Sequence, residues 1–392
     1  MKQYANSKVP QIRFKGFEGA WEDQTLGKLF PITSAARVHK HEWTKSGVPF
    51  FRSSDVVSAF KGKVNTKAYI SYDLYLDLSE KVGRVKKGDM LVTGGGSIGI
   101  PYLVETEDPL YFKDADLLWF KIRDSVDSNY LFTFFLSQPF KRYVKSISHI
   151  GTIAHYTVEQ AKITPLAVPR IETEQTKIGI YFREVDRLIE LHQRKHDKLV
   201  TVKKAMLQRM FPQPGATTPE VRFKGFEGAW REKKIRELID LGGGRDYKHL
   251  SPGHIPVYGT GGYMLSVDKA LSNNDDAIGI GRKGTIDKPY ILRAPFWTVD
   301  TLFYAIPRNE NFLYFIYCIF QRIDWRQKDQ STGVPSLSKA AINEVSVFSS
   351  SYPEQQKIGT YFRQLDELIS KHAIQLQKLK QIKSACLEKM FV

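Results

Sequence analysis

The sequence contains little cysteine and no long apolar run. Its two cysteines, Cys318 and Cys386, are too few for a disulfide framework or for a zinc site built from cysteines. The longest apolar run, Phe312–Phe320, reaches only about half the length that a membrane-spanning helix needs. Residues 1–17 lack the apolar core of a signal peptide. These absences predict a protein of the reducing cytoplasm that does not cross a membrane.

Motifs that mark the common catalytic and metal-binding sites are also missing. The chain has no GxxxxGK[ST] phosphate loop, no [DN]PP[YFW] motif of adenine methyltransferases, and neither HExxH nor GxSxG. Its nine histidines are scattered without the spacing of metal ligands. The paired carboxylates Asp114 and Asp116 are followed by Trp119 and Phe120, which favours a strand edge over an acid–base site. We therefore expect no catalysis, no metal and no cofactor on this chain.

Two glycine runs match the dinucleotide-binding pattern GxGxxG, at residues 94–99 and 279–284. A dinucleotide fold needs a helix directly after the glycines and an acidic residue about twenty positions later. Here the sequences that follow, from Ile100 and from Thr285, are short extended runs that contain proline. We therefore expect hairpin turns, or loops that let a partner's backbone come close, and no nucleotide site.

What the chain has in excess is positive charge. It carries 58 Lys and Arg against 42 Asp and Glu, a formal net charge of +16 over 392 residues. Such an excess favours a polyanionic partner, and nucleic acid first among these. Apolar residues make up 42% of the chain, which is enough for real hydrophobic cores. The length predicts roughly two to four domains.

The chain contains one internal repeat, which is strongest at its two ends. Residues 10–21 read PQIRFKGFEGAW and residues 219–230 read PEVRFKGFEGAW, identical at 10 of 12 positions. Residues 174–211 match residues 354–391 at 19 of 38 positions. Between these matches the offset falls from 209 to 180, so the second copy is the shorter one. The ends of each copy therefore share one task, whereas the diverged middles perform a task that differs between the copies.

The near-identical ends predict two long helices, over residues 171–212 and 351–392. Apolar residues in each recur at alternating steps of three and four, the pattern of a coiled-coil seam. A helix of about 35 residues, roughly 50 Å long, needs a cover for that seam. We expect the two helices to cover each other as an antiparallel pair; the alternative is that each packs on its own globular domain. His192 and His372 occupy equivalent seam positions, where we expect them to set the register.

The remaining residues, 1–170 and 213–350, predict two globular domains of the α+β class, the second preceded by a linker. Each is expected to combine an irregular sheet with one amphipathic helix, around residues 128–145 and 310–328. Short runs of β-forming residues between glycines and prolines predict the strands. The expected strands include Val48–Phe51, Met90–Thr93, Leu117–Phe120, Ile255–Tyr258 and Leu302–Ala305.

Basic and polar residues gather on the loops of both domains. Arg, Lys, Ser, Thr, His and Gln are the side chains that contact base edges and phosphates. For any single residue, solvated surface is an alternative as good as DNA contact. The residues that we predict to contact DNA are Arg52, Ser53, Lys61, Lys63, Lys67, Ser97, His149, Thr152, His155 and Tyr156 in the first domain, and Tyr258, Thr260, Arg282, Lys283, Thr285, Gln330, Ser331 and Thr332 in the second.

Two diverged domains, each followed by a near-identical long helix, together resemble the specificity subunit of type I restriction–modification enzymes. The residues that carry the resemblance are the runs 175–189 and 203–211, their second copies at 355–369 and 390–391, and the repeated RFKGF segment. The glycine-containing loops at Gly151 and Gly333 also fit. The resemblance covers essentially the whole chain, although the second globular domain is much shorter than the first.

The resemblance implies a non-catalytic protein whose two globular domains are target recognition domains, one for each half of a bipartite, asymmetric DNA site. The helix pair would fix the gap between the half-sites and dock two modification (methyltransferase) subunits, which carry S-adenosylmethionine and methylate adenine. Restriction subunits would add translocation and cleavage with ATP and Mg. The helix residues that we predict to dock the modification subunits are Ile178, Tyr181, Phe182, Leu188, Ile358, Tyr361, Phe362 and Leu368.

Three other interpretations stay open at this point. A stand-alone DNA-binding protein would share the charge and the two globular domains, but it would copurify with no enzyme partner. A nucleotide-using enzyme would need the two glycine runs to bind NAD or ATP, which calorimetry can detect. A purely structural coiled-coil protein would leave unexplained why the globular domains diverged while the helices did not.

Overall fold

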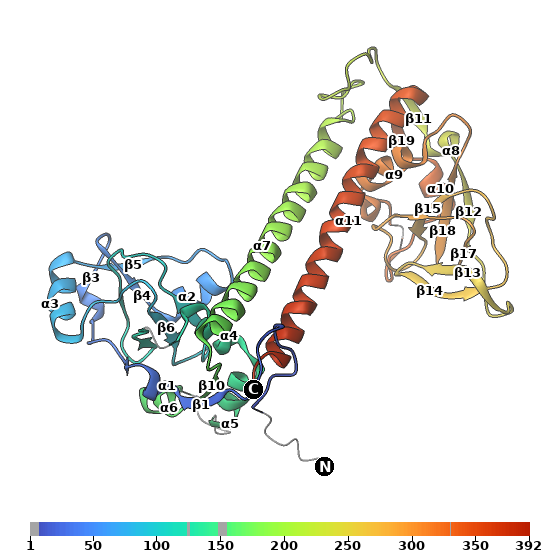
Figure 1. Cartoon of the computed structure of the whole chain (residues 1–392). Helices are drawn as coiled ribbons and strands as arrows, with labels where there is room; N and C mark the ends of the chain where they lie inside the picture. The colour runs from blue at the N-terminus through green and yellow to red at the C-terminus, as the bar shows by residue number, and fades with distance from the viewer. Residues whose placement is uncertain (1–7, 124–125, 148–154, 330) are drawn as a thin grey trace. The chain divides into compact units, whose positions relative to one another are not determined.

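The chain folds into two compact units that share two long helices. The computed structural model describes residues 8–123, 126–147, 155–329 and 331–392. Unit 1 comprises residues 1–191 and 375–392, and unit 2 comprises residues 192–374. Helix α7 (Glu172–Arg209) begins in unit 1 and ends in unit 2, whereas α11 (Tyr352–Lys389) begins in unit 2 and ends in unit 1 (Figure 1). The helices lie within the predicted ranges 171–212 and 351–392.

Unit 1 is a mixed α+β fold with three small sheets. The first sheet is antiparallel, and its strands lie in the order β2 (Ile32–Thr33), β9 (Leu117–Phe120), β6 (Met90–Thr93), β7 (Pro101–Leu103). The second sheet has one parallel pair, β4–β8, and the order β3 (Trp43–Thr44), β5 (Ala68–Ile70), β4 (Val48–Phe51), β8 (Tyr111–Phe112). The third sheet pairs β1 (Glu22–Thr25) with β10 (Pro165–Val168).

The helices of unit 1 are mostly short. They are α1 (Leu26–Leu29), α2 (Ser53–Phe60), α3 (Tyr72–Val82), α4 (Ser128–Leu136), α5 (Gln138–Ile147), α6 (Val158–Lys162) and the 3-10 turn η1 (Lys40–Glu42). The prediction of a single helix around residues 128–145 is wrong, because the helix is interrupted at Ser137, which has an extended backbone. Pro139 explains the break, since proline has no N–H to continue the helix and its ring crowds the preceding turn.

Unit 2 repeats this class with fewer elements. Its four-stranded antiparallel sheet has the order β12 (Ile239–Gly243), β18 (Leu302–Pro307), β15 (Ala277–Gly281), β16 (Tyr290–Leu292). A second sheet has the order β14 (Gly262–Val267), β13 (Pro252–Gly259), β17 (Trp297–Thr298), and β11 (Arg231–Lys234) pairs with β19 (Ser346–Ser349). Its helices are α8 (Ile235–Leu238), α9 (Leu313–Arg322), η2 (Trp325–Lys328) and α10 (Lys339–Asn343).

The strand predictions and the hairpins predicted at the glycine runs are confirmed. All five predicted runs form strands, three of them with the predicted ends. The first GxGxxG run lies in the hairpin between β6 and β7, and the second begins in β15 and continues into the turn before β16. Gly99 and Gly284 have φ values of 77° and 87°, a backbone conformation that glycine adopts at little cost. The predicted helix around residues 310–328 is shorter than expected, because α9 ends at Arg322.

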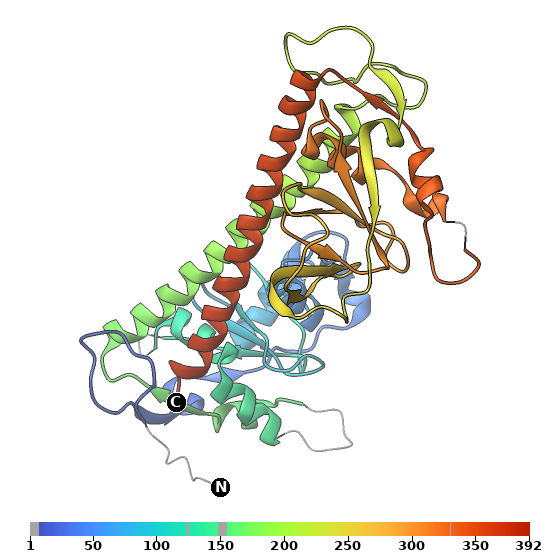
Figure 2. The ribbon, with the colours of Figure 1, turned by 90° about the vertical axis from the view of Figure 1, so that its right-hand side faces the viewer.

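The end of α11 completes the hydrophobic core of unit 1. Met390 and Phe391 are buried there, and the ring of Phe391 stacks on Tyr130 at a centroid distance of 5.5 Å. The ring of Trp21 packs edge to face on Phe391, at a centroid distance of 6.3 Å. The N–H of Ile12 donates to the carbonyl of Lys389 at 3.0 Å, so the N-terminal segment lies beside the helix end (Figure 2). Unit 1 is therefore complete only when the last residues of the chain are present.

The end of α7 has the equivalent place in unit 2. Phe211 is buried, stacks on Phe315 at 5.4 Å, and meets Trp230 at 5.6 Å. The N–H of Val221 donates to the carbonyl of Arg209 at 2.9 Å. The sequence repeat therefore corresponds to a repeated structural contact, with Met–Phe at the end of each long helix and Trp at the start of each copy.

The two long helices are antiparallel in the stretches that each unit contains. In unit 1, Lys383 Nζ binds Asp186 at 2.6 Å. In unit 2, Lys203 Nζ binds Asp366 at 2.6 Å, which is the same ion pair made by the equivalent residues of the repeat. His192 and His372 meet through their Nδ1 atoms at 2.8 Å. Each helix also packs on its own globular domain at its start, so the two predicted arrangements occur together.

None of the helices in the described part of the chain combines the length and the apolar content needed to span a membrane.

We predict that Phe391→Ala destabilises unit 1 and that Phe211→Ala destabilises unit 2. Removing a buried phenylalanine side chain costs about 3–5 kcal/mol, because transfer free energy is lost and a cavity remains. Hydrogen exchange measured by mass spectrometry locates the effect, with faster exchange expected in residues 8–191 for Phe391→Ala. Val392→Ala, a substitution at a half-buried neighbour, is the control and should change little. Equal loss of protection in both units would contradict the assignment of each helix end to one core.

The histidine pair predicts a pH dependence of stability. Burial lowers the pKa of His372, and the nearby charges of His192, Lys195, Lys371 and His196 lower that pKa further. The unfolded chain, with a histidine pKa of about 6.5, then binds more protons than the folded chain, so stability falls as the pH drops below that value. Thermal unfolding from about pH 7.5 to about pH 5.5 should show a smaller loss for His192→Gln/His372→Gln than for the wild type. An equal loss in both proteins would exclude the pair as the cause.

Candidate nucleic-acid interface

The same pair of loops is held together by the same backbone hydrogen bonds in both units. In unit 1, the N–H of Gly94 donates to the carbonyl of Asp116 at 2.9 Å, and the N–H of Tyr156 donates to the carbonyl of Gly94 at 2.7 Å. In unit 2, the N–H of Arg282 donates to Thr301 at 2.7 Å, and the N–H of Leu337 donates to Arg282 at 2.9 Å. We name residues 94–100 with 155–157 the first loop pair, and residues 282–289 with 331–338 the second loop pair.

Each loop pair ends in a short capped helix. Thr157 Oγ1 accepts a hydrogen bond from the N–H of Gln160 at 3.2 Å, which caps α6. Ser338 Oγ accepts from the N–H of Ala341 at 3.0 Å, which caps α10. Because a side chain at this position satisfies the free N–H groups of the helix, the loop has a fixed end point. The backbone framework of the loop pair is thus common to both units.

The side chains on this common framework differ. At the position of Gly94, unit 2 has Arg282, and the next residue is Gly95 in unit 1 but Lys283 in unit 2. The imidazole of His155 occupies the space beside Gly95, since a Cβ at Gly95 would lie 3.6 Å from His155 Nδ1. At these two positions unit 2 therefore carries long cationic side chains. Unit 1 has no side chain there, and an imidazole lies beside its backbone. The two loop pairs can make different contacts with the same kind of ligand.

A basic cavity of about 420 Å³ lies at the second loop pair. Arg282, Lys283 and Lys339 line it with their cationic side chains, and Ser336 and Ser338 contribute hydroxyl groups. None of the described residues that line this cavity carries a carboxylate. Cations and hydroxyl groups around a concave surface match the phosphate oxygens of a nucleic acid.

In unit 1 the start of α2 joins the first loop pair. Ser53 Oγ donates to the carbonyl of Asp116 at 2.9 Å, and the N–H of Gly94 donates to the same oxygen. Arg52 Nε binds Asp55 at 2.8 Å, and Arg52 also donates to the carbonyl of Thr66. Burial alone would raise the pKa of Asp55, but hydrogen bonds from the side chain and backbone of Arg52 outweigh this and lower that pKa. Arg52 therefore holds the loop at residues 61–67 in place, a structural use that differs from the predicted DNA contact.

The structure places the predicted DNA-binding residues in four groups, which differ in how accessible their side chains are. Those with exposed side chains are Lys61, Lys63, Lys67, Ser97, His155, Arg282, Lys283 and Thr332. Those that are half-buried are Arg52, Ser53, Tyr258, Thr260, Thr285 and Ser331. Outside the described residues lie His149, Thr152 and Gln330. The fourth group is Tyr156 alone, which is buried.

Tyr156 was predicted to contact DNA, and the structure corrects this. The side chain is 1% exposed, its ring packs edge to face on Phe140, and its hydroxyl shares a hydrogen bond of 2.6 Å with Thr164 Oγ1. Burial raises the pKa of this phenol far above its ordinary value. Tyr156 therefore anchors the first loop pair to the core, and the exposed side chain of this segment is His155.

Tyr258 and Thr260 lie at a different hairpin, between β13 and β14. The N–H of Val299 donates to the carbonyl of Tyr258 at 3.0 Å, and the hydroxyl of Tyr290 donates to Gly259 at 2.6 Å. These bonds place the hairpin beside the turn that precedes β18. In the same turn, the carbonyl of Thr301 accepts the N–H of Arg282. The structure thus brings Tyr258 and Arg282 to neighbouring segments.

The predicted docking residues of the long helices divide into buried and accessible side chains. Ile178, Phe182, Ile358 and Phe362 are at most 2% exposed and belong to the cores of their units, so their side chains cannot meet a partner. Tyr181 and Tyr361 are half-buried, as is Leu188, whereas Leu368 is 44% exposed. The docking role of these four stays a prediction.

Lys339 and Ser336 were missed as candidate contacts by the sequence analysis. They follow the polar run at residues 330–334 by only a few positions, so extending that run would have included them. Their relation to Arg282 depends on the hydrogen bond from Leu337, which no local pattern reveals. Within the described ranges, no group of three or more His, Cys, Asp or Glu side chains is arranged to hold a metal ion.

Comparison with known proteins gives one consistent family. Residues 18–201 and 227–383 match the family described as "Type I restriction modification DNA specificity domain". A curated relative is the "Putative type I restriction enzyme specificity subunit S.HindORF215P" of Haemophilus influenzae, 26% identical over 157 residues. That match covers 40% of this chain and only 38% of the relative.

A solved structure shows a similar fold over nearly the full length. The S subunit of a type I restriction–modification system from M. genitalium matches with a TM-score of 0.64 and 18% identity, covering 98% of this chain and 99% of that chain. A chain from a structure entitled "Structural basis underlying complex assembly andconformational transition of the type I R-M system" is less similar, with a TM-score of 0.49 and 15% identity over 95% of this chain and 97% of that one. Since the family match spans most of the sequence, the chain belongs to the type I restriction–modification DNA specificity family.

Proposed function

We propose that this chain selects the DNA sequence on which a type I restriction–modification complex acts. Each unit reads one half of a bipartite, asymmetric site through its loop pair and the segments beside it. The chain itself catalyses neither methylation nor cleavage. The basic cavity at the second loop pair and the net charge of +16 support a DNA ligand.

One observation carries this proposal: the two units keep the same loop framework but present different side chains on it. The backbone bonds at Gly94 and Tyr156 recur at Arg282 and Leu337. A protein that reads two different half-sites needs two readers with one architecture and separate surfaces. A protein with a single small ligand would have no need for two such surfaces.

The long helices have two roles in this function. They set the gap between the two half-sites, and they hold the surfaces that dock two modification subunits. These partners carry S-adenosylmethionine and methylate adenine, and restriction subunits with ATP and Mg add cleavage. This chain needs no cofactor of its own, and its DNA substrate places it in the cytoplasm.

We predict that Arg282→Ala, Lys283→Ala and Lys339→Ala each weaken DNA binding by the chain in complex with its modification subunits. A residue that contacts a phosphate should weaken binding to all sequences alike and reduce the slope of log K against log salt by about 0.9. Titrations of labelled duplexes over a salt series measure both effects. Lys371→Ala, at an exposed lysine of α11 outside the cavity, is the matched control. If all three variants behave like Lys371→Ala, the cavity is not a DNA contact.

A second prediction concerns the independence of the two readers. Replacing residues 22–170 by the corresponding segment of another family member should change one half of the selected sequence and leave the other half as it was. Selection of bound duplexes from a randomised pool, followed by sequencing, gives both halves at once. A change in both halves would contradict the assignment of one half-site to each unit. A chain that binds DNA but copurifies with no enzyme subunit would favour the stand-alone DNA-binding protein.

A further inference from the structure

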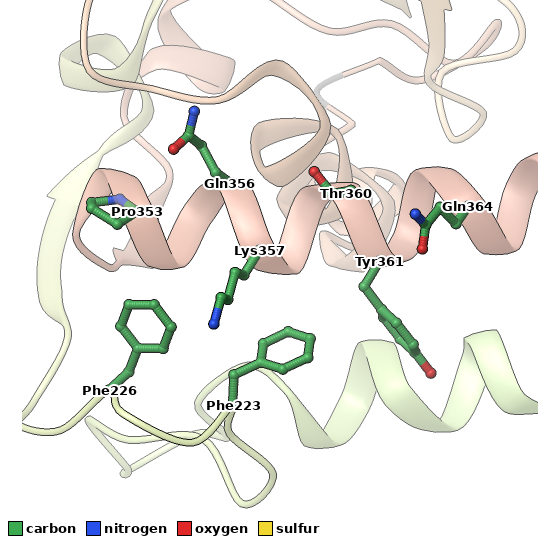
Figure 3. Close-up of a pocket in the computed structure, with 8 residues that line it drawn as sticks. All are labelled: Phe223, Phe226, Pro353, Gln356, Lys357, Thr360, Tyr361 and Gln364. Atoms are coloured by element: carbon green, nitrogen blue, oxygen red, sulfur yellow. The ribbon is translucent and has the colours of Figure 1, made fainter.

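A groove in unit 2 lies between the RFKGF segment and the first turns of α11 (Figure 3). It has a volume of about 530 Å³, and its walls include Phe223, Phe226, Lys357 and Tyr361. Lys357 extends from α11 toward the two phenylalanine rings, with its Nζ 5.4 Å from the centre of the Phe226 ring. Phe223 meets Tyr361 edge to face at 6.1 Å. The groove therefore has aromatic walls and a cation among them.

A buried ion pair fixes the shape of this groove. The guanidinium of Arg222, in the RFKGF segment, donates to both carboxylate oxygens of Glu354 at 2.7 and 2.9 Å. The Glu354 side chain is 1% exposed, and Arg222 also donates to the carbonyl of Gly228 at 2.6 Å. A two-point ion pair with a buried carboxylate holds the loop against the helix. The groove is thus formed before any ligand binds, which lowers the entropy cost of binding.

Unit 1 contains the same arrangement at the start of α7. Arg13 donates to both carboxylate oxygens of the buried Glu174, at 2.6 and 2.8 Å. Phe14 meets Tyr181 edge to face at 5.7 Å, and Lys177 Nζ lies 5.0 Å from the centre of the Phe17 ring. Each contact of the unit 2 groove therefore has an equivalent in unit 1.

Folding explains only part of this repeated surface. The buried ion pair accounts for the arginine, and the core accounts for the tryptophan that ends each segment. Lys15 and Lys224, and likewise Lys177 and Lys357, are identical between the copies although their side chains are exposed. Residues of the loop pairs differ between the copies, as at the half-buried Gly95 and the exposed Lys283. A surface that is unchanged in both units suits one partner bound twice, whereas the DNA-reading surfaces differ.

The charges of the groove indicate the chemistry of its occupant. Among the described residues that line it in unit 2, Lys357 is charged and none is acidic. The nearby carboxylate of Glu354 is already neutralised by Arg222. An apolar side chain would cover the phenylalanine rings, and a carboxylate beside it would pair with the lysine.

We infer that the groove of unit 2 and the equivalent aromatic surface of unit 1 each dock one modification subunit, through a segment that carries an apolar side chain next to a carboxylate. The inference rests on the proposed function, which requires two copies of that partner. It moves the docking contacts from the buried seam residues Ile178, Phe182, Ile358 and Phe362 to the accessible Phe17, Lys177, Phe226 and Lys357. Tyr361 keeps its predicted part as a wall of the groove, and Tyr181 keeps it in the equivalent contact with Phe14.

Charge reversal at the groove of unit 2 and at the equivalent surface of unit 1 tests the inference. Lys177→Glu and Lys357→Glu, alone and combined, are coexpressed with the modification subunit, and native mass spectrometry counts the copies bound to the full chain. The wild type should bind two copies, each single variant one, and the double variant none. The affinity of the altered site should fall at least about tenfold, because an attractive charge pair becomes a repulsive one. Phe17→Ala and Phe226→Ala should give the same pattern while the lysines are kept.

Controls separate the outcomes. Lys371→Glu, on an exposed lysine of α11 outside the groove, should bind two copies, and thermal unfolding should show that every variant is folded. If the double variant still binds two copies, the inference is overturned and the proposed function stands. If the double variant keeps two copies but loses DNA affinity, the groove is a DNA contact, and the inference is overturned in favour of that ligand. A wild-type chain that binds no modification subunit would overturn the proposed function and this inference with it.

Discussion

The burial of a Met–Phe pair from the end of each long helix is the contact on which the rest of the structure depends. Met390 and Phe391 complete the core of unit 1, and Met210 and Phe211 complete that of unit 2. A helix that begins in one unit thus supplies core residues to the other. Unit 2 is the continuous segment 192–374, whereas unit 1 cannot be cut from the chain as a continuous segment without losing Met390 and Phe391 from its core. This explains why the ends of the two sequence copies diverged so little, since each must fit a core that the other copy helps to build.

The residues that hold the fold together are separate from those that we assign to DNA recognition. Ion pairs such as Arg13–Glu174 and Lys203–Asp366 recur at equivalent positions of the other copy, because they hold the helices and entry segments in place. The loop pairs are fixed by backbone hydrogen bonds, which leave the side chains free to vary. Recognition can therefore change by substitution at positions such as Gly95 or Lys283 without disturbing the fold. A family whose members specify many different DNA sequences needs such a separation between the residues that hold the fold and those that contact DNA.

Much of the fold was predictable because its signals are local. Apolar spacing gave both long helices, and runs such as Met90–Thr93 gave strands with the observed ends. The failures have tertiary causes. Tyr156 lies in a polar loop, but its ring is buried against Phe140, and only the packing reveals this. Lys339 joins Arg282 only through contacts between distant segments. Arg52 binds Asp55 and Thr66, and its DNA contact stays a prediction.

In the proposed function, one chain reads a DNA sequence in two separate halves. The most direct test is to coexpress it with its modification subunit in a host without adenine methylation and to map N6-methyladenine by single-molecule sequencing. We expect one split motif, with two defined halves separated by a fixed number of unspecified bases. A continuous motif would contradict reading of the site by two separate units. So would the absence of methylation when the complex is assembled and binds S-adenosylmethionine.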